Sequence, residues 1–203
     1  MLDGARADWG LSARGRRMKG IIFNLLEEFV VETQGIEVYE QVLAATALRT
    51  TDPFVGPGSY PDEDLMALVE TTVARLGIDQ NDAMRAFGRF CIPKLAQRFP
   101  ALMAPYRHPK AFLLTVTKLH ELEVRKLYPD ATPPRFAYES PAENRLVMRY
   151  LSPRKLCALV AGLIDGVADH YGVPISHEQT RCMASGADCC EFQIAFAAPE
   201  GEK

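Results

Sequence analysis

The sequence has no long apolar run. No stretch approaches the roughly 18 apolar residues that a membrane-spanning helix requires. Residues 1–17 place four arginines among small residues, without the apolar centre of a secretory signal peptide. We therefore expect a cytoplasmic protein with no membrane span. We interpret residues 1–17 as a flexible N-terminal extension, with Met18 as an alternative start.

Signatures of several enzymes and of nucleic-acid-binding proteins are also missing. The formal net charge is −3, and no basic stripe with interleaved aromatic residues occurs, so we expect no nucleic-acid partner. There is no glycine-rich phosphate loop, no nucleophile elbow and no HExxH motif. A hydrolase or a nucleotide-dependent enzyme therefore has no positive support.

The composition is that of an ordinary globular domain, with 48% hydrophobic and 24% charged residues over 203 positions. We assign one domain to residues 18–197 and a short tail to residues 198–203. Helical periodicity dominates the first 128 residues, and two hairpins, at 136–151 and 175–196, flank one more helix. We therefore predict an α+β fold, in which an N-terminal helical half packs on a C-terminal antiparallel β-sheet with helices.

Local signals predict where these helices begin, end and bend. Asp62 and Asp79 are expected N-caps, because short acidic side chains accept hydrogen bonds from the first free amides of a helix. Gly77 and Gly172 are expected to end their helices. Pro93 is expected to kink or divide the helix in which it lies.

One histidine lies inside an apolar stripe and is followed by a group of hydrogen-bond donors. His120 shares a helical face with Phe112, Val116, Leu119, Val124 and Leu127, a setting more typical of a packed core histidine than of a ligand. In the strand that follows, Tyr150 and Ser152 share one face and Arg154 comes just beyond its end. A phenol, a hydroxyl and a guanidinium together form a donor set for carboxylates.

The segments MKGIIFNLLEEFV and LHELEVRKLYP, together with the Tyr-x-Ser-x-Arg motif at 150–154, resemble the bacterial heme nitric oxide/oxygen binding (H-NOX, or HNOB) family. This family is related to the sensor domain of soluble guanylate cyclase. The likeness runs from Met18 to about Phe196. It implies that heme b is buried between the helical half and the sheet.

The same resemblance implies roles for individual residues. His120 corresponds to the proximal ligand of the heme iron, and Tyr150, Ser152 and Arg154 correspond to the residues that bind the heme propionates. Pro134 matches a position that presses on the porphyrin and distorts it. These roles are compatible with the carboxylate-binding set that the residues themselves suggest.

The resemblance also bears on which gas is bound. Family members that hold dioxygen carry a tyrosine where this sequence has Leu159, supported by a tryptophan and an asparagine at the positions of Leu26 and Cys91. Ile22 is expected to line the same pocket. Because these side chains supply no distal hydrogen-bond donor, we expect a sensor of nitric oxide, which also takes carbon monoxide, and not an oxygen carrier.

The resemblance thus implies a non-catalytic sensor. In such proteins nitric oxide weakens the iron–histidine bond, which here would free His120 and let its helix shift. The signal would pass to a separate protein, by family analogy a histidine kinase or a cyclic-di-GMP enzyme. Two alternatives stay open: a heme enzyme with peroxidase-like or nitric oxide-consuming activity, and a heme-free, zinc-stabilised interaction module.

A cysteine cluster suggests a second input. By number, Cys157, Cys182, Cys189 and Cys190 could form a tetrahedral zinc site. A subset of the family holds zinc with three cysteines and one histidine, and the cysteines at 157, 182 and 190 match three of those ligands.

The fourth zinc ligand is open in the sequence. Gln179 stands at the position of the expected histidine, which leaves Cys189 and His177 as equal alternatives. Strand alternation places His177 on the face opposite Cys182 unless a bulge intervenes. The other interpretation is that the cysteines are reduced thiols, or a redox pair that forms a disulfide.

Overall fold

An antiparallel sheet of four strands forms the C-terminal half of the fold. The computed structural model describes residues 16–120 and 133–197. The sheet has the order β3-β4-β6-β5, and a separate two-stranded ribbon joins β1 to β2. The strands are β1 (Arg17–Lys19), β2 (Ser59–Pro61), β3 (Arg135–Ala142), β4 (Arg145–Leu151), β5 (Ile175–Arg181) and β6 (Cys190–Phe196).

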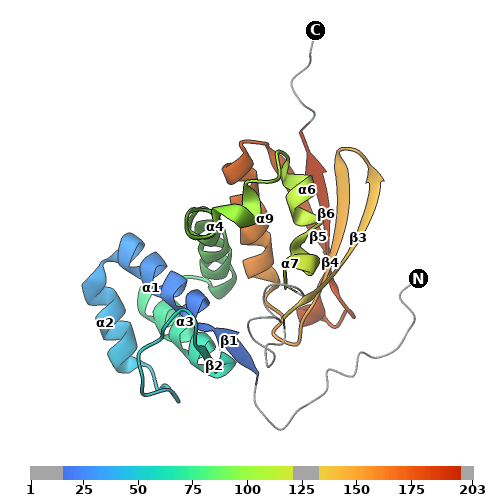
Figure 1. Ribbon diagram of the computed structural model, residues 1–203. Helices are drawn as coiled ribbons and strands as arrows, with labels where there is room; N and C mark the ends of the chain where they lie inside the picture. The colour runs from blue at the N-terminus through green and yellow to red at the C-terminus, as the bar shows by residue number, and fades with distance from the viewer. Residues whose placement is uncertain (1–15, 121–132, 198–203) are drawn as a thin grey trace.

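Helices make up most of the N-terminal half. They gather on one side of the molecule, and the long C-terminal helix lies beside the sheet (Figure 1). This arrangement confirms the predicted α+β fold. The helices are α1 (Gly20–Gln34), α2 (Ile36–Ala45), α3 (Asp62–Leu76), α4 (Gln80–Arg98), α5 (Pro100–Met103), α6 (Pro109–Leu113), α7 (Val116–Leu119), α9 (Cys157–Tyr171) and the 3-10 turn η2 (Met183–Ser185).

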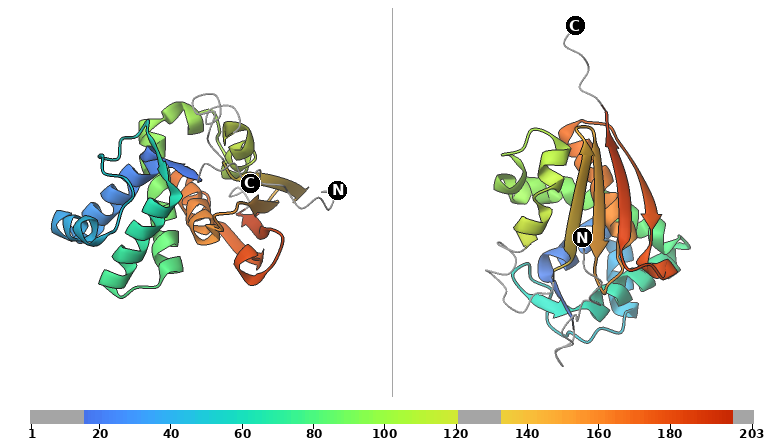
Figure 2. Two further views of the ribbon diagram at one scale, coloured as in Figure 1. Left: turned by 90° about the horizontal axis from the view of Figure 1, so that it is seen from below. Right: turned by 90° about the vertical axis from the view of Figure 1, so that its right-hand side faces the viewer.

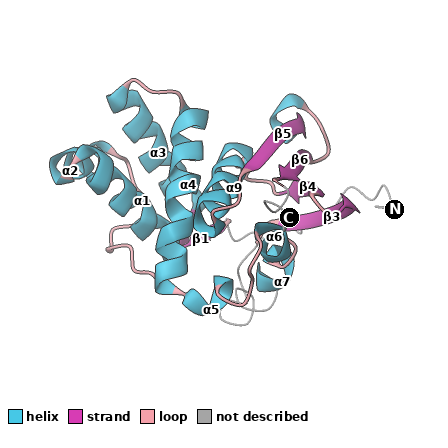
Figure 3. Cartoon of the chain, turned by 90° about the horizontal axis from the view of Figure 1, so that it is seen from above, coloured by secondary structure: helices cyan, strands magenta, loops and turns pink. Residues whose placement is uncertain are grey.

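Helices α4 and α9 pack together at the centre of the molecule, between the α1–α3 group and the sheet (Figure 3). Their close approach depends on glycine. A Cβ atom on Gly162 would lie 1.9 Å from the Arg85 carbonyl oxygen, and one on Gly88 would lie 2.4 Å from the Leu159 carbonyl oxygen. Because the neighbours are backbone atoms, any larger residue would force the helices apart.

The buried apolar residues form two clusters, one in each half. The helical cluster contains Phe23, Leu68 and Phe87 from α1, α3 and α4. The sheet cluster contains Phe192 from β6 and Ile164 from α9. No helix of the described ranges covers the opposite face of the sheet, as the right-hand view of Figure 2 shows.

Three local predictions can be compared with the structure. Asp79 caps α4, because its carboxylate accepts hydrogen bonds from the amides of Asn81 and Asp82. The prediction for Asp62 is wrong: Pro61 holds the N-cap position of α3, and no side chain caps this helix. Helix α4 runs continuously through Pro93 instead of dividing there.

The described part of the chain begins at residue 16 and is interrupted after His120. Strand β1 begins at Arg17, one residue before Met18. Residues 121–132 lie outside the described ranges, and with them the predicted end of the His120 helix. In the part of the chain that the structure describes, no helix combines the length and apolarity needed to cross a bilayer.

Candidate heme-binding site

His120 lies at the C-terminal end of α7 with its ring partly buried. Its Nδ1 atom is 2.8 Å from the Val116 carbonyl oxygen, and its ring faces that of Phe136 with centroids 6.0 Å apart. Burial lowers the pKa of His120, and the hydrogen bond to Val116 offsets this only in part. The imidazole is therefore neutral near pH 7. A carbonyl can only accept, so Nδ1 carries the proton and Nε2 keeps a lone pair for a metal.

Tyr150 and Ser152 lie at the end of β4, next to the turn that leads into α9. Both are buried, with exposed fractions of 3% and 0%. The Tyr150 hydroxyl accepts a hydrogen bond from the Leu156 amide at 3.3 Å, and Ser152 Oγ accepts one from the Arg154 amide at 3.3 Å. Burial raises the pKa of Tyr150, so its hydroxyl keeps its proton and can donate it in a hydrogen bond.

The guanidinium of Arg154 already holds a carboxylate in this structure. Its Nη2 donates to Asp62 Oδ1 at 3.2 Å, its Nε lies 2.6 Å from Asp62 Oδ2, and Nη2 also donates to the Arg17 carbonyl at 3.0 Å. The arginine side chain is only 9% exposed. The donor set at 150–154 is thus buried and arranged for carboxylates, which is the chemistry that heme propionates require.

Four predicted pocket residues come together in the helical cluster. Leu26 and Cys91 are buried members of it, at 4% and 3% exposed, and Ile22 and Leu159 pack against it. Burial raises the pKa of the Cys91 thiol, which therefore stays neutral. Because these side chains are aliphatic or a neutral thiol, they provide an apolar wall without a strong hydrogen-bond donor.

The proximal candidates lie on the other side, next to the sheet cluster. Phe136, which contacts the His120 ring, packs against that cluster together with Val116, and Pro134 is partly buried immediately before β3. The apolar wall thus belongs to the helical cluster, whereas His120 contacts Phe136 beside the sheet cluster. The chemistry of these residues fits a flat, apolar prosthetic group with carboxylate arms.

Three of the four cysteines predicted to form a cluster come together in the structure, and the fourth does not. The sulfur atoms of Cys157, Cys182 and Cys190 all lie within 4.8 Å of one another, and those of Cys157 and Cys182 are 3.8 Å apart. These are free cysteines in this structure. Cys189 lies outside the group, as does His177, among the residues that the structure describes.

Two of the three sulfurs differ in acidity. Burial raises the pKa of Cys190 to about 12. Burial also opposes ionisation of Cys182, but hydrogen bonds from the backbone at Ala184 and Ser185 and from the other two cysteines outweigh it, and its pKa lies below the ordinary value. Cys182 is therefore ionised more readily than Cys190, as expected for a ligand of a thiophilic ion.

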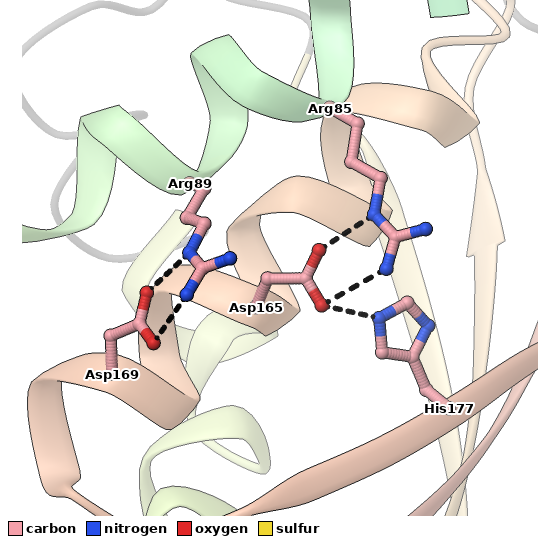
Figure 4. Close-up of polar contacts among 5 residues, drawn as sticks. All are labelled: Arg85, Arg89, Asp165, Asp169 and His177. Carbon is pink, nitrogen blue, oxygen red and sulfur yellow. Dashed lines mark hydrogen bonds and ion pairs between the residues drawn. The ribbon is translucent and has the colours of Figure 1, made fainter. Parts of the chain in front are cut away.

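The bulge on which the prediction for His177 depended is present. Thr180 and Arg181 interrupt the regular pairing of β5 with β6, so that Cys182 returns to the face that His177 occupies. His177 is nevertheless engaged elsewhere: its Nε2 lies 2.8 Å from Asp165 Oδ1, and Arg85 holds the same carboxylate from α4 (Figure 4).

Two residues with clear roles in the structure were missed in the sequence. Asp62 was interpreted as a helix cap, and its pairing with Arg154 spans 92 residues of sequence. Asp165 was not singled out, although it holds His177 away from the cysteines. Neither pairing leaves a local signal, because both partners come together only when distant elements pack.

Comparison with known proteins identifies the family of this chain. The Haem-NO-binding (HNOB) family model matches residues 19–179. A search of the curated proteins returned no match.

Several solved structures are similar to this chain. An H-NOX protein from Shewanella oneidensis in the Fe(II)NO ligation state is 32% identical, with a TM-score of 0.83, over 89% of this chain and all of that chain. A mutant of it in the Fe(II) state is likewise 32% identical over 92% of this chain and all of its own, with a TM-score of 0.84. The Fe(II) unliganded H-NOX protein from K. algicida is 24% identical over 92% of this chain and all of that chain, with a TM-score of 0.79, and shows the shared fold.

The fold and the site define a heme-based gas-sensor domain. This chain belongs to the H-NOX family of Haem-NO-binding domains.

Proposed function

We propose that this protein senses nitric oxide at a heme held by His120, with Tyr150, Ser152 and Arg154 binding the propionates. The single observation that carries the proposal is the neutral His120 imidazole, whose Nδ1 is fixed by the Val116 carbonyl and whose Nε2 remains available as a ligand. Heme, when bound, supplies the iron that takes a diatomic gas. The S. oneidensis relative has been crystallised with nitric oxide on its Fe(II), which supports the same use here.

The apolar wall sets the choice of gas. Leu26, Cys91 and Leu159 offer no strong donor to a polar bound ligand. Dioxygen on iron depends on such a donor far more than nitric oxide does, because nitric oxide affinity comes mainly from the metal–ligand bond. The pocket therefore favours nitric oxide and carbon monoxide over dioxygen.

Release of His120 is the proposed switch. The residue directly follows α7, which contacts β3 among the described elements. If heme iron is held by this imidazole, its release would free the residue to move, as in a ligand-biased two-state element. We propose that a separate signalling protein, a histidine kinase or a cyclic-di-GMP enzyme, detects this movement.

The cysteine cluster is proposed as a second input. Cys157 at the start of α9 lies next to Cys182 and Cys190 of the terminal hairpin. Three neighbouring sulfur atoms can bind zinc or undergo reversible thiol oxidation. The chain shows no distal acid–base histidine or arginine at the described wall positions, which supports a sensor over a peroxidase-like or nitric oxide-consuming enzyme.

The test compares the heme spectra of wild-type protein and His120→Ala. We expect the ferrous wild type to show a Soret band, the variant to lose it or bind heme weakly, and added imidazole to restore it by replacing the missing ring. On addition of nitric oxide, the wild-type spectrum should report loss of the imidazole ligand. A Soret band unchanged by His120→Ala would contradict the assignment, and multiple turnovers with peroxide would favour the enzyme.

A further inference from the structure

Three sulfur atoms lie at the spacing of one metal coordination sphere. Cys157 comes from the first turn of α9, Cys182 follows β5, and Cys190 begins β6. Zinc–sulfur bonds of about 2.3 Å in a tetrahedron place two sulfurs about 3.8 Å apart. The Cys157 and Cys182 sulfurs lie 3.8 Å apart, so this pair needs almost no movement to share an ion.

Among the described residues, no fourth protein ligand is in place. All five cysteines and all four histidines of the chain fall in the described ranges, and only three of these side chains form the group. His177 is on the same face as the cluster, but its side chain is 7% exposed and bound to Asp165, which is anchored in turn by Arg85 (Figure 4). Moving His177 to a metal would leave the Asp165 carboxylate without one of its donors.

The remaining neighbours, Cys189 and Gln179, are poor candidates for the fourth zinc ligand. Cys189 is buried outside the group, in the bend that immediately precedes Cys190 at the start of β6. The Gln179 amide donates to the Arg181 carbonyl at 3.1 Å, within the bulge, and an amide oxygen is a weak ligand for zinc compared with thiolate or imidazole.

We propose that Cys157, Cys182 and Cys190 form a three-thiolate zinc site whose fourth position is open to an exchangeable ligand from solution, such as water or an imidazole. This inference rests on the zinc input proposed above and specifies its coordination. Structural zinc sites are closed by four protein ligands, whereas sites with three keep a position for an external ligand. Cys157 and Cys182 are partly exposed, so solvent reaches the site from their side, and the buried Cys190 closes the other.

X-ray absorption at the zinc edge tests this in the full-length, heme-loaded chain supplied with one equivalent of zinc, because heme iron does not contribute at that edge. We expect three sulfur atoms and one oxygen or nitrogen around zinc, without the outer-shell scattering of an imidazole ring. Added imidazole should introduce that scattering. Gln179→His is the matched closing variant: it should show ring scattering without added imidazole and no further change when imidazole is added.

Three results would contradict a zinc site with an open fourth coordination position. Four sulfurs in the wild type, reduced to three in Cys189→Ser, would assign Cys189 as the fourth ligand. Ring scattering in the wild type that disappears in His177→Ala would assign His177. Protein that retains no zinc, while its Soret band and nitric oxide response are intact, would overturn the zinc site and leave the heme proposal standing. The Soret band also confirms that each variant folds.

Discussion

At the scale of single residues, the character of the pocket depends on the groups that it lacks as much as on those it contains. Leu159 projects from α9 into the helical cluster, where Leu26 and Cys91 are its neighbours in the apolar wall. If heme binds as proposed, a hydrogen-bond donor at this position would be available to a ligand on the iron. The wall therefore offers a direct test of gas selectivity.

Leu159→Tyr should raise dioxygen affinity. One neutral hydrogen bond contributes about 1 kcal/mol, which corresponds to about a fivefold gain in affinity. Leu159→Phe is the matched control, because it adds the ring without the hydroxyl, and it should show no such gain. The measurement is dioxygen binding to the ferrous protein, followed at the Soret band. A wild-type protein that already holds dioxygen stably in air would contradict the donor-free interpretation.

Two ion pairs of the same geometry differ in burial and should differ in energy. The Asp165 side chain is 18% exposed and also binds His177, whereas the Asp169 side chain is 50% exposed and binds only Arg89 among the described residues (Figure 4). Asp165→Asn should lower the free energy of unfolding by about 1–3 kcal/mol. Asp169→Asn should lower it by about 0–1 kcal/mol. Equal losses in urea unfolding would contradict this ranking.

The cost of Asp165→Asn should also depend on pH. Burial acts to raise the pKa of Asp165, but hydrogen bonds from Arg85 and His177 outweigh it, and the pKa lies below its ordinary value of 3.8. A carboxyl with a depressed pKa contributes stability above its unfolded-state pKa and loses it as the pH falls through the folded value. The difference in stability between wild type and variant should therefore be full at pH 7 and shrink below about pH 4.

At the scale of elements, basic side chains along α4 form ion pairs with acidic side chains of two other helices, α9 and α1. Arg85 and Arg89 pair with α9. After Pro93 the same helix reaches α1, where Lys94 pairs with Glu32 and Arg98 with Glu28. The helix thus connects the apolar wall to the sheet half. Its contact with α9 depends on the close approach of the two backbones at Gly88 and Gly162, which have no side chain.

Gly162→Ala should destabilise the fold. The added Cβ would lie 1.9 Å from the Arg85 carbonyl oxygen, and overpacking of this kind typically costs about 1–3 kcal/mol. Gly56→Ala is the matched control, because its Cβ would meet nothing closer than 3.5 Å, and it should range from neutral to about 1 kcal/mol stabilising. Urea unfolding of both variants measures the difference. Equal free energies of unfolding for the two variants would show that α4 and α9 can move apart without loss of stability.

At the scale of the whole molecule, the prosthetic group is expected to join the two apolar clusters. A ligand that binds only the folded state stabilises it by mass action. Heme removal should therefore lower the unfolding midpoint of the wild type. Because Arg154 also pairs with Asp62, its effect must be separated from its structural role.

Arg154→Ala should reduce the gain in unfolding midpoint that heme produces. The comparison is made within each protein, heme-loaded against heme-free, so that the lost pairing with Asp62 cancels. Charge-assisted hydrogen bonds contribute about 1.5–3 kcal/mol, and this part of the heme-dependent stabilisation should disappear. Thermal unfolding followed by circular dichroism measures it. A heme-dependent gain equal to that of the wild type would exclude Arg154 from propionate binding.

The sequence by itself determined the α+β class and the helix cap at Asp79, whereas its grouping of His120 with the 150–154 donors stays a prediction. The first two features follow from periodicity and local capping. Only the tertiary structure decided the partners of Asp62 and His177 and the membership of the cysteine group. Each of these depends on a contact across more than one element: α3 against the turn after β4, α9 against β5, and a bulge that rotates Cys182 toward Cys190. No local pattern encodes such contacts, because they form only when the helices and the sheet pack together.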